Sequence, residues 1–290
     1  MDIFLQLTVS GLSTGMIYAL AAAGFVVIYK ASDVINFAQG DLLLLGTYLI
    51  FFGVAQAGLP WSLGVLVTLL LAVAVALAVE RLVLRPLVGE PIISMIMVTI
   101  GLSSVLRGAI NAIWGPNPRA FESFLPAGDL VIGPAVLSAA RVLSIPIALA
   151  VLAALGLFFR HARDGIAMRA IADDQQAALS MGISIPRVFG VAWGLAAASA
   201  AIGGIMLGNI VGVSPNVAAI GLRVFPVVIL GGLDSIKGAV VGGAIIGLLE
   251  VYVGFYVGHG LNLVVPYLVL IMVLMVRPYG LFGKEIIERV

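Results

Sequence analysis

Polar and ionisable side chains inside otherwise apolar stretches are the residues of this sequence that could do chemistry. Thr99, Ser103, Arg107 and Asn111 recur at steps of four, so they share one face of a predicted helix whose other faces are apolar. Such a stripe forms hydrogen bonds with a neighbouring helix, or it lines a polar pathway. Both interpretations fit the residue types.

Glu250 is the acidic counterpart in the second half of the chain. Gly243, Gly247, Glu250 and Gly254 share one helical face, so the carboxylate projects from a seam of small residues. A charge in an apolar environment needs a partner. The sequence therefore supports the hypothesis of an ion pair between Arg107 and Glu250.

Two apolar stretches are interrupted by polar residues or proline. Asn36, Gln39 and Asp41 open the first, where Asn36 could act as N-cap and Asp41 could lie near the positive end of the helix dipole. Arg223 lies beside Pro226 in the second. Interrupted helices often line the pathways of transporters, so the alternative is that these residues form a translocation pathway or its gate.

Other chemistries find little support in the sequence. There is no cysteine, and the two histidines, His161 and His259, lie far apart, which does not favour a metal site. No nucleophile and base stand out as a pair, so an intramembrane enzyme is not favoured. The stretch nearest to a phosphate-binding loop, Gly280 to Glu285, lacks the required pattern. We expect no bound cofactor or metal, and this chain is not expected to bind ATP through such a loop.

The elements that carry these residues are membrane helices. The 290 residues are 62% hydrophobic and 10% charged, which excludes a soluble globular protein, and the net charge of +1 gives no reason to expect nucleic acid as a partner. Stretches of about 20 apolar residues predict spans, and these are Leu7–Tyr29, Ser62–Leu84, Ile92–Ile113, Val142–Phe159, Val188–Val211, Ala239–Val257 and Leu261–Val276, with Phe37–Ala57 and Val213–Leu233 as weaker, interrupted ones. The predicted fold is an all-α integral membrane protein, a polytopic helical bundle of about 8–9 spans with one or two broken or re-entrant helices, forming a single transmembrane domain over 1–290.

The distribution of Lys and Arg predicts the orientation, because cytoplasmic loops are enriched in both. With the N-terminus periplasmic and the C-terminus cytoplasmic, Arg119 and Arg141 lie outside and eleven basic residues lie inside, namely Lys30, Arg81, Arg85, Arg160, Arg163, Arg169, Arg187, Lys237, Arg277, Lys284 and Arg289. Residues 114–140 then form a periplasmic loop and residues 160–187 a cytoplasmic loop.

The cytoplasmic loop is the most charged part of the chain, and its apolar residues recur at helical spacing. One or two short amphipathic helices are predicted, with Gly182 as the C-terminal stop and Pro186 at the start of the next element. Such a segment either lies on the membrane surface or docks a cytoplasmic partner.

Four motifs together resemble the branched-chain amino-acid permease family of ABC importers. Gln176-Ala177-Ala178-x-x-x-Gly182 is similar to the Glu-Ala-Ala-x-x-x-Gly coupling motif of bacterial importer permeases, with Gln in place of Glu. The other three are Val34 to Asp41, Arg163 to Asp174, and Phe225 to Gly238. The size and the segment Thr14 to Leu20 are similar to the shorter of the family's two permeases.

The resemblance implies one subunit of a permease heterodimer in the bacterial inner membrane, with two cytoplasmic ATPase subunits and a periplasmic substrate-binding protein. It implies ATPase coupling by the loop residues Arg169, Ala170, Asp173, Asp174, Gln176, Ala177, Ala178 and Gly182. The expected function is ATP-driven import of branched-chain or other small hydrophobic amino acids by alternating access. A permease of the same family for amides or urea, or an ion-coupled secondary transporter working alone, are the alternatives.

Overall fold

The computed structural model describes residues 2–87, 89–119, 122–125, 128–132, 135–258 and 260–283. His259, Lys284 and Arg289, as well as parts of the predicted 114–140 loop, lie outside the described residues. The elements are α1 (Asp2–Ser32), α2 (Gln39–Phe51), the π-helix η1 (Phe52–Gln56), α3 (Trp61–Val79), the π-helix η2 (Glu80–Leu84), the 3-10 helix η3 (Arg85–Leu87), α4 (Ile92–Trp114), β1 (Asp129–Ile132), β2 (Ala135–Ser138), α5 (Ala139–His161), α6 (Arg163–Asp173), α7 (Gln175–Ser180), α8 (Ile185–Val211), the 3-10 helix η4 (Pro215–Ala219), α9 (Ile220–Gly231), α10 (Ile236–Tyr256), the 3-10 helix η5 (Leu261–Leu263) and α11 (Val265–Val276).

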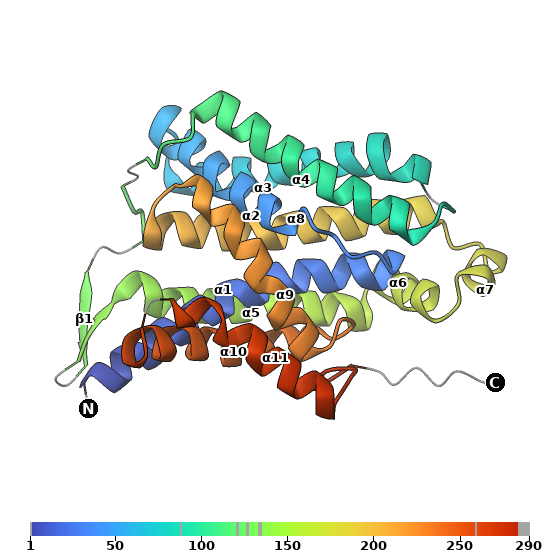
Figure 1. Cartoon of the computed structure of the whole chain (residues 1–290). Coiled ribbons are helices and arrows are strands. Elements are labelled where there is room, and N and C mark those ends of the chain that lie inside the picture. Colours follow the sequence, from blue (N-terminus) through green and yellow to red (C-terminus); the bar gives the residue numbers. More distant parts are fainter. Residues whose placement is uncertain are drawn as a thin grey trace.

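The long helices lie side by side and give the molecule two ends (Figure 1). The N-terminus and the hairpin of β1 and β2 lie at one, called here the hairpin end, and α6 and α7 lie at the other, called the α7 end. Among the described residues, six helices are long and apolar enough to cross a membrane: Ile3–Ser32, Trp61–Leu87, Ile92–Trp114, Ala139–His161, Ile185–Val211 and Ile236–Tyr256. The segments Pro215–Gly231 and Leu261–Val276 form shorter apolar helices.

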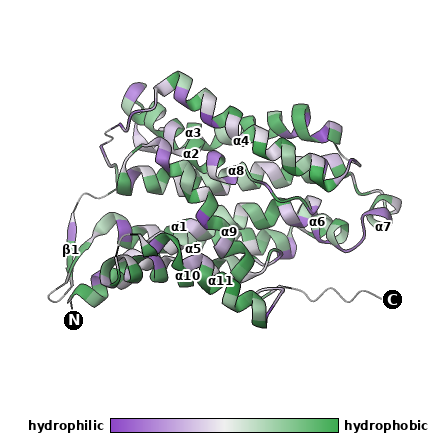
Figure 2. Ribbon diagram, in the orientation of Figure 1, coloured by the Kyte–Doolittle hydropathy of each residue, from purple (hydrophilic) through white to green (hydrophobic). Residues whose placement is uncertain are grey.

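The outer helices expose apolar side chains that a membrane would cover. Leu66 and Leu70 of α3 and Ile93, Val105 and Ile113 of α4 are each more than half exposed. Figure 2 shows hydrophobic residues along most of the length of the long helices. Exposed apolar surface of this extent is unfavourable in water, whereas lipid tails accept it. The chain is therefore an all-α, multi-pass membrane protein, to which the short hairpin adds a feature that the sequence did not predict.

Helix α1 is the centre of the bundle and is buried along most of its length, with α10, α8 and α5 packed around it. Its closest neighbour is α10, because glycines of the two helices face each other. A Cβ atom added at Gly15 would lie 2.3 Å from the carbonyl oxygen of Gly243, and one added at Gly247 would lie 2.4 Å from that of Gly11. The predicted small-residue seam of α10 is thus the surface that packs against α1.

The two interrupted segments form short helices inside the bundle. Helix α2 begins at Gln39 rather than Phe37, is buried over its whole length and continues as the π-helical turn η1. Its first residue contacts the backbone of Ala196, near the middle of α8, so α2 begins deep within the bundle and not at its end. Helix α9 follows the 3-10 turn that starts at Pro215 and contains Pro226.

The predicted cytoplasmic loop folds into the two short helices α6 and α7. Asp174 lies between them. Its carboxylate accepts hydrogen bonds from the backbone N–H groups of Gln176 and Ala177 and thereby caps α7. Gly182 has a φ of 79° just after α7, and Pro186 lies in the first turn of α8. The predicted stop at Gly182 and the start at Pro186 are both confirmed.

We expect Gly247→Ala to lower the free energy of unfolding by about 1–3 kcal/mol, because the added methyl group forces α1 and α10 apart. Gly101→Ala in α4 is the matched control, since its Cβ would meet no atom within 4 Å. Thermal unfolding of the purified variants in detergent measures the difference. Equal midpoints for the two variants would contradict the close approach of α1 and α10.

Candidate functional site

Two groups of hydrogen-bonded polar and ionisable residues lie near the start of α2 and along α9. We call them together the central polar site. Its members are Tyr18, Asn36, Gln39, Asp41, Thr99, Ser103, Arg107, Arg223 and Glu250.

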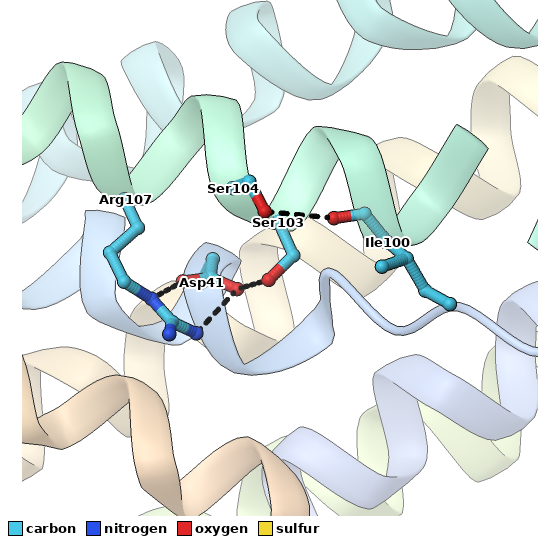
Figure 3. A network of polar contacts seen from close by, with 5 residues as sticks. All are labelled: Asp41, Ile100, Ser103, Ser104 and Arg107. Atoms are coloured by element: carbon cyan, nitrogen blue, oxygen red, sulfur yellow. Dashed lines mark hydrogen bonds and ion pairs between the residues drawn. The ribbon is translucent and has the colours of Figure 1, made fainter. Parts of the chain in front are cut away.

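The first group is centred on Asp41, in the first turn of α2. Its carboxylate is buried, and the positive end of the helix dipole favours a negative charge at this position. Arg107 of α4 donates from Nε to Asp41 Oδ1 at 3.1 Å and from Nη2 to Oδ2 at 3.5 Å, and the Ser103 hydroxyl also donates to Oδ2. Figure 3 shows Ser103 and Arg107 reaching from α4 toward the same carboxylate. The polar stripe of α4 therefore faces α2.

The segment before α2 is held by side-chain hydrogen bonds. Asn36 Oδ1 accepts from the backbone N–H of Ala38, and Asn36 Nδ2 donates to Gln39 Oε1 at 3.2 Å. The prediction of Asn36 as N-cap is wrong, because α2 begins at Gln39 and its N-cap position is Ala38, which has no capping side chain. Asn36 instead stabilises the turn that leads into the helix. Thr99 of α4 accepts a hydrogen bond from the backbone N–H of Phe37.

The second group joins α1, α9 and α10. Arg223 of α9 forms an ion pair and hydrogen bond with Glu250 of α10. Tyr18 of α1 donates its hydroxyl proton to Glu250 Oε2 at 2.8 Å and accepts a hydrogen bond from Arg223 Nη1 at 3.1 Å. The three side chains thus satisfy one another in a low-dielectric interior.

The hypothesis of an ion pair between Arg107 and Glu250 is wrong. The face of α4 that carries Arg107 packs on α2, where Asp41 supplies the carboxylate, whereas α10 faces α1 and α9. Arg223 supplies the cation for Glu250. Asp41 and Glu250 thus belong to two separate ion pairs among the described residues.

The two groups lie on either side of a contact between α2 and α9. A Cβ atom added at Gly40 would lie 2.5 Å from the Cα atom of Gly221, so the backbones of the two broken helices touch at this point. The rings of Phe37 and Phe225 pack beside this contact, with their centroids 5.0 Å apart. The two interruptions predicted from sequence are thus brought together in space.

The arginines of both pairs reach the surface of the bundle. The Asp41 and Glu250 side chains are 1% and 10% exposed, but those of Arg107 and Arg223 are 49% and 32% exposed. A charged side chain at this depth costs at least about 2.5–3.5 kcal/mol if lipid surrounds it. The half-exposed guanidinium groups are therefore suited to a water-filled path or to a protein partner, and not to a lipid surface.

Sequence reasoning found most members of the central polar site and missed one. It did not identify Tyr18 as a site residue, although this residue lies on α1 opposite the face of α10 that carries Glu250. Conversely, Asn111 is not joined to the site by a hydrogen bond. Within the described part of the chain, its Oδ1 atom is buried without a hydrogen-bond partner.

The predicted coupling residues lie together at the α7 end, away from the central polar site. Arg169, Ala170 and Asp173 belong to α6, and Gln176, Ala177 and Ala178 belong to α7. Ala177 is exposed, whereas Ala178 is buried in a cluster with residues of α6 and α8. Next to them, Leu179 and Met181 expose 52% and 83% of their surfaces. The segment therefore presents apolar side chains to the space beyond the bundle.

A known family matches nearly the whole chain. The family described as "Branched-chain amino acid transport system / permease component" matches residues 7–274. The chain belongs to this family. Two similar relatives are the high-affinity branched-chain amino acid transport system permease proteins LivH of Escherichia coli (strain K12), 32% identical over 303 residues, and BraD of Pseudomonas aeruginosa, 30% identical over 302 residues. Each comparison covers 99% of this chain and 98% of the relative.

A more distant relative and a solved structure extend the comparison. The probable branched-chain amino acid transport permease protein LivH of Methanocaldococcus jannaschii is 25% identical over 279 residues, which cover 92% of this chain and 88% of that protein. Among solved structures, PsaBC from Streptococcus pneumoniae in complex with Fab aligns with a TM-score of 0.50 at 15% identity, covering 91% of this chain and 88% of that chain. At this identity the likeness concerns the fold alone.

A double-mutant cycle tests the pairing in the central polar site. We expect Asp41→Ala and Arg107→Ala to be coupled by about 0.5–3 kcal/mol in unfolding free energy, because either variant alone leaves one charge unpaired. Arg107→Ala and Glu250→Ala should be additive within about 0.5 kcal/mol, since these residues have different partners. Unfolding of the purified chain in detergent measures both cycles. A coupling energy between Arg107 and Glu250, with none between Asp41 and Arg107, would contradict the observed pairs.

Proposed function

We propose that the chain is the permease component of an ATP-driven importer of branched-chain amino acids. The observation that carries this proposal is the family match over residues 7–274, together with more than 30% identity to a named branched-chain amino acid permease over 99% of the chain.

We further propose nine membrane crossings that form a single transmembrane domain. Six are the long helices, and the others are α2 with η1, α9 with η4, and α11. With the N-terminus periplasmic, nine crossings leave the α7 end and the segment after α11 on the cytoplasmic side. The excess of Lys and Arg in the loops predicted to be inside supports this orientation.

The energy source and the partners belong to the same proposal. The chain carries no phosphate-binding loop of the ATPase type, so two ATPase subunits supply hydrolysis in trans, and a periplasmic binding protein delivers the substrate. A second, homologous permease completes the path. The half-exposed Arg107 and Arg223 support this arrangement, because a second permease or a water-filled path would spare them contact with lipid.

The central polar site is the proposed pathway or gate. The broken helices α2 and α9 meet at Gly40 and Gly221, and each carries one member of an ion pair with a neighbouring helix. Interrupted helices at the middle of a membrane protein commonly form the site around which alternating access occurs. The two pairs connect α2 to α4 and α9 to α10, so rocking of these helices would open or close the path between them.

Helix α7 is the proposed docking element for an ATPase subunit. The Asp174 cap fixes its first turn, and Leu179 and Met181 are exposed next to it. An apolar surface at the end of a short, capped helix suits a cleft in a partner protein. Arg169 and Asp173 of α6, together with Gln176 and Gly182, complete the proposed coupling segment.

Uptake of labelled leucine tests the proposed function. We expect cells that lack this chain to lose leucine uptake by its importer and to regain it when the chain is supplied together with its companions. The uptake should stop when ATP is depleted, even with an ion gradient in place. Unchanged leucine uptake in the deletion strain would refute the branched-chain assignment, whereas uptake that persists without ATP would favour an ion-coupled transporter. Uptake of an amide or urea in its place would favour the related permeases.

A charge on the exposed face of α7 should disturb binding of the ATPase subunits without disturbing the folding of the chain. We expect Ala177→Asp to abolish co-purification with the ATPase subunits while the thermal stability of the chain changes little, because Ala177 is exposed. Ala57→Asp is the matched control, because Ala57 is also exposed and lies toward the hairpin end, away from α7. If Ala177→Asp still co-purified and transported normally, the docking role of α7 would be wrong.

A further inference from the structure

A cavity of about 650 Å³ lies at the α7 end, apart from the central polar site. Its walls come from four separated parts of the chain. These are the end of α1 with Tyr29 and Asp33, helix α6 with Ile166 and Arg169, the turn between α9 and α10 with Asp234, and the segment after α11 with Tyr279. Its size falls within the range of small-molecule sites.

The walls of the cavity combine charged groups of both signs with apolar side chains. Three carboxylates (Asp33, Asp173 and Asp234) and two cations (Lys30 and Arg169) share the cavity with aliphatic and tyrosine side chains, among them Ile229 and Leu233. The surplus of carboxylates disfavours nucleotides and other polyanions. Groups of both signs around an apolar wall fit a small zwitterion with an apolar side chain.

Two of the three carboxylates belong to segments far apart in the sequence. Asp33 follows the end of α1 and Asp234 lies in the turn between α9 and α10, and both line the cavity together with Tyr29. Partial burial raises the pKa of the Asp33 carboxyl above its usual value. Asp33 also has a φ of 54°, a conformation that Asp and Asn adopt more readily than most residues. A ligand ammonium group on this side of the cavity would face two carboxylates.

We propose that this cavity binds a free amino acid with an apolar side chain. The ammonium group faces Asp33 and Asp234, the carboxylate faces Arg169, and the side chain packs against the wall formed by Ile166, Ile229 and Leu233. This proposal rests on the proposed function for its placement on the cytoplasmic side, where the ligand would be the imported product.

Binding here would act on transport through α6. Helix α6 leads directly into α7 through Asp174, so a ligand that joins α6 to α1 and to the turn between α9 and α10 restrains the proposed docking element. A ligand that favours one position of α6 shifts the transporter toward that state. The cavity therefore provides feedback, in which accumulated amino acid slows further import.

Equilibrium dialysis of labelled leucine against the purified complete transporter, without its binding protein, tests the binding. We expect Asp33→Asn combined with Asp234→Asn to weaken binding by about tenfold or more, because two charged hydrogen-bond acceptors for the ammonium group are lost. Asn keeps the size of Asp and tolerates the φ of residue 33. The control is Glu90→Gln, an exposed acid outside the cavity, which should leave binding unchanged. Equal binding by all three proteins would overturn the proposal.

The feedback has its own measurement. Each protein is reconstituted in vesicles with either leucine or sucrose trapped on the cytoplasmic side, and the initial rate of uptake is measured in both. For wild type and Glu90→Gln, we expect the rate with trapped leucine to be well below the rate with trapped sucrose, so that their ratio is well below one. The ratio should return to about one for the double Asn variant. A ratio near one for wild type, or equal inhibition of all three proteins, would overturn the feedback.

Accessibility distinguishes a small ligand from a protein occupant. Because the chain has no cysteine, Ile166→Cys introduces a single thiol into the cavity wall. We expect a small thiol reagent to label it in the assembled transporter and leucine to slow the labelling. Labelling of the isolated chain but not of the assembled transporter would mean that a partner subunit fills the cavity. Since dialysis and labelling require no uptake, failure of these tests is distinguishable from failure of the proposed function.

Discussion

The buried start of helix α2 is the constraint on which the rest of the structure depends. A helix that begins inside a bundle has free N–H groups and, here, an aspartate, and each of these needs a partner where water is scarce. Asn36, Gln39 and Thr99 stabilise the approach, while Ser103 and Arg107 satisfy Asp41. Close packing completes the arrangement, because Gly40 and Gly46 allow the backbones of α9 and α8 to approach α2 directly. Full burial of α2 thus depends on glycine contacts on two sides and polar contacts on a third.

The long helices could be predicted because apolar length is a local property. The predicted spans Ser62–Leu84, Ile92–Ile113 and Val142–Phe159 agree with α3 to η3, α4 and α5 within a few residues. The interruptions at residues 36–41 and 215–226 were also readable from polar residues and prolines. The hairpin was not, since its strands are only four residues each and lie in a proline-containing loop. Their pairing depends on the position of the flanking helices.

The partners of the charged residues could not be predicted, because they depend on which helices are neighbours. The stripe of Thr99, Ser103 and Arg107 was correctly assigned to one face of a helix. The choice of Glu250 as its partner is wrong because the sequence does not show that α2 packs on α4, which brings Asp41 to an arginine 66 positions away. Tyr18 was missed for the same reason. Its sequence neighbours suggest packing alone, and its role follows from the glycine seam that brings α1 beside α10.

Helix α9 links the two regions of the chain to which we assign proposed functions. At one end, Gly221 touches Gly40 of α2, and Arg223 is paired with Glu250. At the other, the carbonyl groups of Leu230 and Gly231 accept hydrogen bonds from the backbone N–H groups of Leu281 and Phe282, at the α7 end. Because α9 has only twelve residues and packs closely at both ends, a displacement at the α7 end must either move the whole helix or break one of these contacts. A short, doubly anchored helix of this kind is a physical route by which movement at the proposed coupling segment can reach the central polar site.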